Sequence, residues 1–449
     1  EQIMALDRPF AQLAQRQMVV VLVNALIVVG IYRLARRVFG ARAAVMGAMF
    51  VALDPFFLAE SRVLRFEGLV AGLMSLSVLA AFVYVKEQRG CALRLSAVTA
   101  GVAALTKISA VLLAPVVGLI LLALLPDWRQ GISPRAIRRV GVAFVVWSLL
   151  AAFTFWVVWP AMWVSPVSTL QTVFDFAYQA SEEGLEGRGV FFWGQVYPDD
   201  PGPWFYPVAF LFRITPLVLL GVMAVVVLLA KDRRCVTQRP SAGYWTWWGT
   251  VALFAYTFFF AFTMTLGAKK YDRYLMPIFP ICGLLAGIGL TQIANLKSQI
   301  SKLNLWCLAF TLLLVIQSAL VLPHLPYYYT YYNPLLGGIQ QAAKVIRVGF
   351  DEGLDIAARY LEAKPDAARL KVASGNSSKI QPLFSGQTIP LDNLDGRWVQ
   401  ADYVLIYFSQ VQRGKHDPAI LDYLKRHDAE FVVTLHGLDY AWLYPGPAF

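Results

Sequence analysis

The stretch Asp54–Gly68, D-P-F-F-L-A-E-S-R-V-L-R-F-E-G, is a short charged island between two apolar runs. Its ionisable residues are Asp54, Glu60, Arg62, Arg65 and Glu67. Ionisable side chains at the edge of a membrane helix bundle cost free energy and usually serve a function. A second island, Lys269–Tyr274 with the sequence K-K-Y-D-R-Y, lies between two other apolar runs. We predict that the two islands meet on one membrane face and bind an anionic lipid headgroup. The alternative is two ordinary solvated turns.

The composition is typical of a polytopic membrane protein. The 449 residues are 58% hydrophobic and 15% charged, with a mean hydropathy of +0.56, which is far from a soluble chain. The net charge of +11 comes from basic residues in short loops between apolar runs. No basic stripe with a groove-reading motif is visible, so we expect no nucleic-acid partner.

The cysteines and histidines predict neither a disulfide framework nor a zinc site. The four cysteines are scattered over basic loops (Cys91, Cys235) and apolar runs (Cys282, Cys307), which is unlike a disulfide scaffold. All four histidines follow residue 323 without metal-ligand spacing. The pair Asp199-Asp200 has two interpretations: a metal-binding acidic pair, or a turn within P-D-D-P-G-P. A divalent metal cofactor therefore stays open.

Ten apolar runs are long enough, or nearly so, to span a bilayer core of about 30 Å. They fall near 18–38, 43–59, 66–85, 93–106, 108–125, 140–161, 206–230, 245–266, 275–294 and 305–322. The pair at 93–106 and 108–125 is separated only by Thr106-Lys107, so one long broken helix is the alternative there.

Basic residues follow the odd-numbered runs, which orients the chain. These residues are Arg33, Arg36, Arg37, Arg42, Lys86, Arg89, Arg94, Arg129, Arg135, Arg138, Arg139, Lys231, Arg233, Arg234, Arg239, Lys297 and Lys302. Such loops face the cytoplasm, and the alternation requires 93–106 and 108–125 to be two spans. Six cations fall on the other face against this rule, which indicates an anionic ligand there: Arg62, Arg65, Lys107, Lys269, Lys270 and Arg273.

The same orientation puts both visible ends of the chain outside the cytoplasm. Since the sequence starts at Glu1, we expect a missing first span and its outer loop. The outer loop 162–205 predicts an interfacial helix, then a turn at 181–189 and an aromatic, proline-rich segment at headgroup level. The aromatic run Tyr327–Gly338 predicts a belt where the last span leaves the membrane.

Two domains are predicted: a transmembrane domain at 1–323 and an extracytoplasmic α/β domain at 324–449. In the second domain, periodicity predicts helices at 351–363 and 418–427 and strands at 370–374, 401–408 and 431–435. About 125 residues suffice for a modest core. No Gly-rich phosphate fingerprint is visible there.

The cations of both islands suit phosphate. The guanidinium of Arg62 is a planar fork of donors that matches phosphate oxygens, and Lys269, Lys270 and Arg273 lie beside tyrosines at the lipid boundary. The alternative is nonspecific snorkelling to lipid headgroups.

Five motifs in order resemble a known family. They are Y-R-L-A-R-R-V-F-G-A-R-A-A, A-L-D-P-F-F-L-A-E-S-R-V-L-R-F-E-G, A-L-T-K, W-F-Y-P-V-A-F-L-F-R-I-T-P-L and K-K-Y-D-R-Y-L-M-P-I-F-P. Over most of residues 17–340 the chain resembles the protein O-mannosyltransferase and aminoarabinose-transferase group of polyprenyl-phosphate-sugar-dependent glycosyltransferases. These enzymes (glycosyltransferase family 39 and relatives) share the GT-C membrane fold.

The resemblance implies roles for individual residues. It implies that Arg62, Lys269, Lys270 and Arg273 bind the carrier phosphate, with Glu67 at the acidic place of the S-R-x-x-x-x-[DE] motif. We add Arg65, Lys107 and Tyr274 as supporting residues. In the family, the catalytic acid lies in the first outer loop, which we place upstream of Glu1, so the catalytic residue is unknown and Asp7 is not assigned that role.

The sequence thus predicts a hexosyl or pentosyl transferase in the plasma (inner) membrane. Its donor is a polyprenyl-phosphate sugar, and its acceptor on the extracytoplasmic face is a protein, lipid or glycan. One alternative is a lipid or solute transporter or flippase, although charges at one rim and the lack of a visible repeat are unlike that class. A non-catalytic scaffold is the other.

Overall fold

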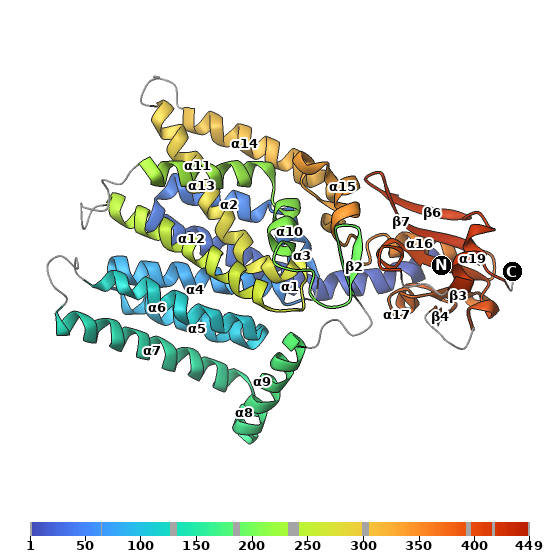
Figure 1. Cartoon of the computed structure of the whole chain (residues 1–449), viewed down its shortest axis with the longest axis horizontal. Helices are drawn as coiled ribbons and strands as arrows, with labels where there is room; N and C mark the ends of the chain where they lie inside the picture. Colours follow the sequence, from blue (N-terminus) through green and yellow to red (C-terminus); the bar gives the residue numbers. More distant parts are fainter. Residues whose placement is uncertain are drawn as a thin grey trace. The chain divides into compact units, whose positions relative to one another are not determined.

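The computed structural model describes residues 2–63, 65–125, 133–182, 189–231, 242–298, 305–391, 397–414 and 418–447. The chain divides into two compact units, which we treat separately (Figure 1). Unit 1 comprises Glu1–Met18, Gly184–Arg213 and His324–Phe449, and unit 2 comprises Val19–Glu183 and Ile214–Pro323. Residues 1–18 and 184–213 therefore group with the tail, whereas the sequence division after residue 323 placed them with the membrane domain.

All ten apolar runs are helical. The helices are α1 (Gln2–Phe39), α2 (Ala41–Ala52), α3 (Pro55–Arg62), α4 (Glu67–Glu87), α5 (Gly90–Thr106), η1 (Ile108–Leu112), α6 (Leu113–Leu121), η2 (Leu122–Leu124), α7 (Pro134–Val158), α8 (Ala161–Val164), α9 (Pro166–Glu182), α10 (Phe205–Arg213), α11 (Pro216–Lys231), α12 (Ala242–Leu266), η5 (Asp272–Ile278), α13 (Phe279–Ser298), α14 (Leu305–Val321) and η6 (Leu322–His324). Within the described residues, six helices are long and apolar enough to cross a membrane, or up to eight with two bent pairs, and two shorter apolar helices complete the predicted runs.

Two runs predicted as single spans are each broken at a proline. Asp54 caps α3 by accepting a hydrogen bond from the Phe57 backbone N–H at 2.7 Å, and Pro55 takes the first helical position, where its missing N–H has no cost. The chain therefore bends by 59° between α2 and α3. The 206–230 run is likewise two helices, because Pro216 starts α11.

The region 93–125 forms two separate helical segments, as the alternation of basic loops requires. The helix α5 ends at Thr106, and Lys107 is extended, with φ −158° and ψ 132°. Both segments pack against α7: the Trp147 Nε1–H donates to the Ser96 hydroxyl of α5 at 2.9 Å, and a Cβ on Gly118 of α6 would lie 3.6 Å from Phe144. Figure 1 shows α5 and α6 between α4 and α7.

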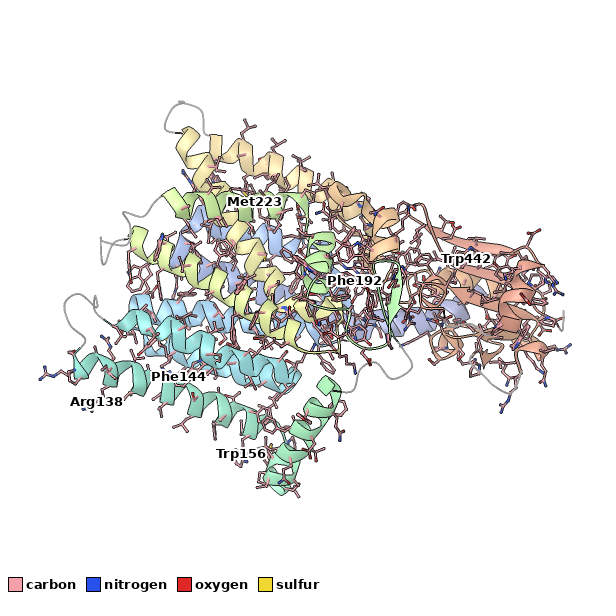
Figure 2. All side chains as sticks on the ribbon, viewed as in Figure 1. Arg138, Phe144, Trp156, Phe192, Met223 and Trp442 are labelled. Carbon is pink, nitrogen blue, oxygen red and sulfur yellow. The ribbon has the colours of Figure 1, made fainter. Side chains whose placement is uncertain are left out.

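The helices of unit 2 differ widely in how much of their apolar surface is buried. In the most apolar stretch of the α4 and η5–α13 spans, 78% and 89% of the residues are buried. In the corresponding stretches of α7 and α14, only 17% and 11% are buried. Apolar side chains such as Trp156 and Met223 therefore lie on the outer surface (Figure 2). A soluble protein rarely exposes this much apolar surface, so unit 2 is an integral membrane bundle.

Small residues let the central helices approach closely. On α13, Gly283 and Gly287 form a G-x-x-x-G pattern that faces Gly47 of α2, and a Cβ on Gly287 would lie 2.5 Å from the Gly47 Cα. Ala286 of α13 packs against Gly221 of α11 in the same way. Such small-residue contacts are the usual route to tight helix packing in membranes.

Unit 1 is an α/β unit whose five-stranded sheet has the order β4-β3-β5-β7-β6. β3 pairs in parallel with β4 and β5, and β7 pairs antiparallel with β5 and β6. The predicted helices and strands are confirmed, whereas β4, β7 and the hairpin β1-β2 were not predicted. The elements are β1 (Val190–Phe192), β2 (Gln195–Tyr197), η7 (Tyr328–Thr330), η8 (Pro334–Leu336), α15 (Gly338–Val345), α16 (Leu354–Glu362), η9 (Ala367–Arg369), β3 (Lys371–Ser374), α17 (Ser377–Ile380), η10 (Gln381–Leu383), β4 (Gln387–Pro390), η11 (Arg397–Gln400), β5 (Tyr403–Tyr407), α18 (Phe408–Val411), α19 (Pro418–Lys425), β6 (Phe431–Leu435) and β7 (Leu438–Pro445).

The prediction of an aromatic belt at Tyr327–Gly338 is wrong. Its tyrosines Tyr328, Tyr329, Tyr331 and Tyr332 are buried within unit 1, none more than 8% exposed. Three of them, Tyr329, Tyr331 and Tyr332, contact Arg213, which is itself 1% exposed. The Arg213 Nη1 donates to the Tyr329 carbonyl at 2.9 Å, and its Cζ lies 4.3 Å from the centre of the Tyr332 ring. The tyrosines therefore enclose a buried cation instead of facing lipid headgroups.

The prediction for the aromatic segment before α10 is partly wrong. Trp193 and Trp204 are exposed, but Phe205 and Tyr206 are buried in unit 1. The Asp200 carboxylate accepts a hydrogen bond from the Gly202 N–H at 2.8 Å, which is the turn interpretation of this acidic pair. The predicted turn at 181–189 lies mostly outside the described residues, as does Cys235.

Candidate functional site

A charged cluster forms at the start of α4, from three distant parts of unit 2. The Glu67 Oε1 lies 3.6 Å from the Lys107 Nζ and 3.3 Å from the Arg273 Nε. Their side chains are 12%, 27% and 22% exposed, respectively. Lys107 is the extended residue between α5 and η1, and Arg273 lies in η5. The two sequence islands are thus joined by an ion pair.

Two tyrosine rings hold the cations in place. The Lys107 Nζ lies 4.2 Å from the centre of the Tyr274 ring, and the Arg273 Cζ lies 4.2 Å from that of Tyr271. These are cation–π contacts, and the two rings pack edge to face at 5.3 Å. Burial lowers the pKa of Lys107, and the Glu67 carboxylate opposes that shift.

The end of α3 closes on the start of α4, which places Arg62 at the same end of unit 2. Asn24 of α1 donates from its Nδ2 to the Ser61 carbonyl at 3.4 Å. A Cβ on Gly68 would lie 2.8 Å from the Ser61 Oγ and 3.1 Å from the Glu60 carbonyl, so the two segments are in close contact there. Arg62 directly follows Ser61 and is half-buried, as is Arg65. The residues of the first island therefore pack against one another where α3 meets α4.

The two lysines of the second island, Lys269 and Lys270, lie in different surroundings. Lys269 lines a cavity together with Lys107 and Tyr274. Lys270 is buried in unit 2, at 1% exposure, and among the described residues it is not part of the cavity lining. The Asp272 Oδ1 accepts a hydrogen bond from the Arg273 backbone N–H at 2.8 Å, which fixes the backbone that presents the Arg273 side chain.

The cavity has a volume of about 1070 Å³ and walls that are mainly apolar. Its lining consists of Ala104, Leu105, Thr106, Lys107, Ile108, Ser109, Phe155, Val158, Trp159, Thr172, Val173, Phe176, Thr263, Met264, Leu266, Gly267, Lys269 and Tyr274. The contribution of α9, through Thr172, Val173 and Phe176, was not predicted. The helical spacing of apolar residues in α9 predicts contact with the membrane interface alone.

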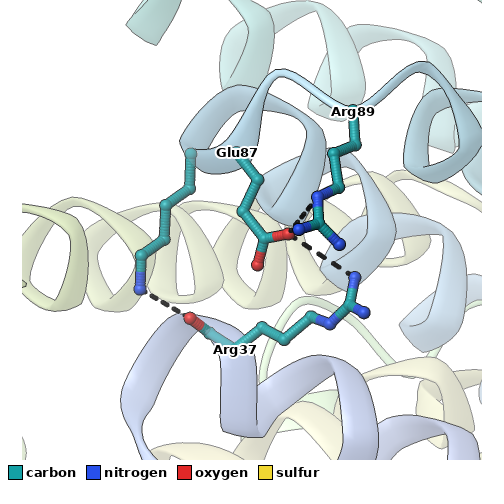
Figure 3. A network of polar contacts seen from close by, with 4 residues as sticks. Arg37, Glu87 and Arg89 are labelled. Atoms are coloured by element: carbon teal, nitrogen blue, oxygen red, sulfur yellow. Dashed lines mark hydrogen bonds and ion pairs between the residues drawn. The ribbon is translucent and has the colours of Figure 1, made fainter.

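The opposite end of α4 carries a second ion-pair cluster. The Glu87 Oε2 lies 3.5 Å from the Arg37 Nη1 and 3.4 Å from the Arg89 Nε, and the Lys86 Nζ donates to the Arg37 carbonyl at 2.5 Å (Figure 3). The 21 residues of α4 at about 1.5 Å each span about 30 Å, the thickness of a bilayer core. Basic residues of three other predicted loops, Arg129, Arg233, Arg234, Arg239 and Lys302, lie outside the described residues.

The described residues contain no group of three or more His, Cys, Asp or Glu side chains arranged to hold a metal ion. The cluster at Glu67 has one acidic ligand and several cations, and so it suits an anion better than a cation. The arrangement is thus an apolar cavity with cations and phenol rings at one end.

Comparison with known proteins adds a partial family match. Residues 12–159 match the family model for dolichyl-phosphate-mannose-protein mannosyltransferase. No curated protein matches the chain at a significant level. These 148 residues include Arg62, Glu67 and Lys107.

Solved structures are similar only at a low level. ArnT from Cupriavidus metallidurans bound to undecaprenyl phosphate is 15% identical over 96% of this chain and 84% of its own, with a TM-score of 0.42. The Archaeoglobus fulgidus oligosaccharyltransferase tethered to an acceptor peptide is 12% identical over 97% of this chain and 63% of its own, with a TM-score of 0.43. The family match itself confirms, over residues 12–159, the resemblance of this chain to the mannosyltransferase group of GT-C membrane glycosyltransferases.

Proposed function

We propose that this protein transfers a hexosyl or pentosyl group from a polyprenyl-phosphate donor to an acceptor on the extracytoplasmic face of the plasma (inner) membrane. The observation that carries the proposal is the position of Lys107, which is at once a wall of the apolar cavity and a member of the cation cluster with Arg273. An amphiphile with a phosphate head and a long apolar tail suits both environments. The acceptor is a protein, a lipid or a glycan.

The cations would act on the leaving group. An acceptor oxygen attacks the anomeric carbon, the bond from that carbon to the phosphate oxygen breaks, and its electron pair remains on the phosphate. Lys107 and Arg273, with Arg62 and Lys269 nearby, stabilise the negative charge that develops there. The proton of the acceptor hydroxyl goes to a general base, a role that we assign to none of the residues of the cation cluster. Glu67 is already paired with two cations, and we assign it a different role below.

The test is lipid-phosphate binding by the full chain in detergent. We expect Lys107→Met and Arg273→Met each to weaken binding of undecaprenyl phosphate about tenfold or more, because a hydrogen bond to a charged group contributes about 1.5–3 kcal/mol. Binding of undecaprenol, which lacks the phosphate, should not change. Arg37→Met and Arg89→Met, at the other end of α4, are the matched controls and should bind like the wild type. Unchanged binding of the phosphate lipid in both site variants would contradict the proposal.

A transfer assay with a labelled polyprenyl-phosphate sugar then decides the reaction class. Release of free polyprenyl phosphate that depends on the acceptor supports a transferase. Movement of the labelled lipid across proteoliposomes, with no sugar transferred, would favour the flippase alternative instead.

A further inference from the structure

Glu67 occupies the place on the two cations that an incoming phosphate needs. A single oxygen, Oε1, is the partner of both the Lys107 Nζ and the Arg273 Nε. The carboxylate is only 12% exposed, so water screens it weakly. The structure thus already holds one anion between the two cations.

The cations have little freedom to serve a second anion elsewhere. Each one stacks at 4.2 Å on its own tyrosine ring, Lys107 on Tyr274 and Arg273 on Tyr271. Tyr274 also lines the cavity with Lys107. A phosphate that reaches both cations from the cavity must therefore come close to the Glu67 carboxylate, and two anions at such a distance repel each other.

We propose that Glu67 is a resident counter-ion, which the lipid phosphate displaces from Lys107 and Arg273 on binding and which takes those cations back when the phosphate leaves. The inference rests on the proposed function. In this arrangement Glu67 keeps a strongly cationic site paired between turnovers. It also limits the affinity for the product polyprenyl phosphate, so that the product can leave.

The chain contains a matched control on the same helix. Glu87, at the other end of α4, is also paired with two cations, Arg37 and Arg89, and its side chain is 24% exposed (Figure 3). Replacing either glutamate with glutamine removes one charge and keeps the shape. Only the Glu67 change should affect the binding of a phosphate.

The experiment compares wild type, Glu67→Gln, Glu67→Asp and Glu87→Gln by titration with undecaprenyl phosphate in detergent. We expect Glu67→Gln to bind the lipid about tenfold more tightly, the fold-change that corresponds to about 1.4 kcal/mol. Its turnover in the transfer assay should be slower, because the product leaves more slowly. Glu67→Asp keeps the charge and should bind within about threefold of the wild type, and Glu87→Gln should bind like the wild type.

The outcomes separate this inference from the proposed function. Weaker or unchanged binding in Glu67→Gln, with binding still lost in Arg273→Met, would overturn the counter-ion role and leave the phosphate site in place. If the wild type and Arg273→Met bind undecaprenyl phosphate equally well, the proposed function itself is contradicted. If Glu67→Gln does not fold, Glu67→Ala, which also removes the carboxylate, takes its place, and binding no tighter than that of the wild type would contradict the inference.

Discussion

Replacing Gly287 with leucine is expected to prevent unit 2 from folding. A Cβ on Gly287 would lie 2.5 Å from the Gly47 Cα and closer still to the Gly47 backbone nitrogen. Neither atom can rotate away, so α2 and α13 would have to separate. The α13 span is 89% buried, and overpacking of this kind in a membrane interface removes the close backbone contact on which helix association depends.

The measurement is the yield and thermal unfolding of the full chain in detergent. Gly287→Leu should give little monodisperse protein, and Gly287→Ala should unfold at a clearly lower temperature than the wild type. Gly141→Leu on α7 is the control, because no atom lies within 4 Å of a Cβ at that helical position. A Gly287→Leu protein with the melting temperature of the wild type would show that the α2–α13 contact is not tight in the folded protein.

The helix bundle and most members of the cation cluster could be predicted from the sequence, because the lipid bilayer constrains both. Long apolar runs must be helical in lipid because the bilayer offers no hydrogen-bond partners, and positive loops on one face decide where the remaining charges lie. Glu67, Lys107, Arg273 and Tyr274 could therefore be assigned to one face. Their pairing with each other depended on how the helices pack, which the sequence does not give.

The features that were missed depend on partners distant in sequence. The tyrosines after α14 are buried because Arg213, 116 residues before Tyr329, reaches them. The position of α9 at the cavity likewise depends on how the helices pack, and it could not be predicted from the sequence of α9 alone. The break at Asp54-Pro55 and the G-x-x-x-G pattern at Gly283 are different, since an N-cap before proline and paired small residues are recognisable signals.

Replacing Arg213 with methionine is expected to destabilise unit 1 by about 1–3 kcal/mol, the usual cost of leaving a buried hydrogen-bond acceptor without its donor. Arg213 is 1% exposed and donates to the Tyr329 and Tyr331 carbonyls at 2.9 and 3.4 Å. Methionine fills a similar volume but offers no donor. The carbonyls would stay buried without this hydrogen bond, and the tyrosine rings would lose their cation.

The same change should make the stability of unit 1 more dependent on pH, through Glu352. Burial raises the pKa of Glu352, and the charge of Arg213 partly opposes that shift. A carboxyl group whose pKa is raised by folding contributes stability below its unfolded pKa, and this contribution is lost as the pH rises through the folded pKa. Without Arg213 the folded pKa rises further. The free energy of unfolding should therefore fall more steeply from acidic to neutral pH in Arg213→Met than in the wild type.

Hydrogen exchange of the full chain in detergent measures both effects on unit 1 alone. Amides of β5 and β7, the strands that carry Tyr407 and Tyr440, should exchange faster in Arg213→Met, and the difference from the wild type should grow between pH 5 and pH 8 after correction for the intrinsic rate. Tyr407 donates to the Glu352 Oε2 at 3.0 Å, so the loss of Arg213 reaches the sheet through that bond. Arg369→Met, at an exposed position of unit 1, is the control. Equal protection in Arg213→Met and Arg369→Met at both pH values would mean that the buried cation does not stabilise the fold, because its desolvation cancels its contacts.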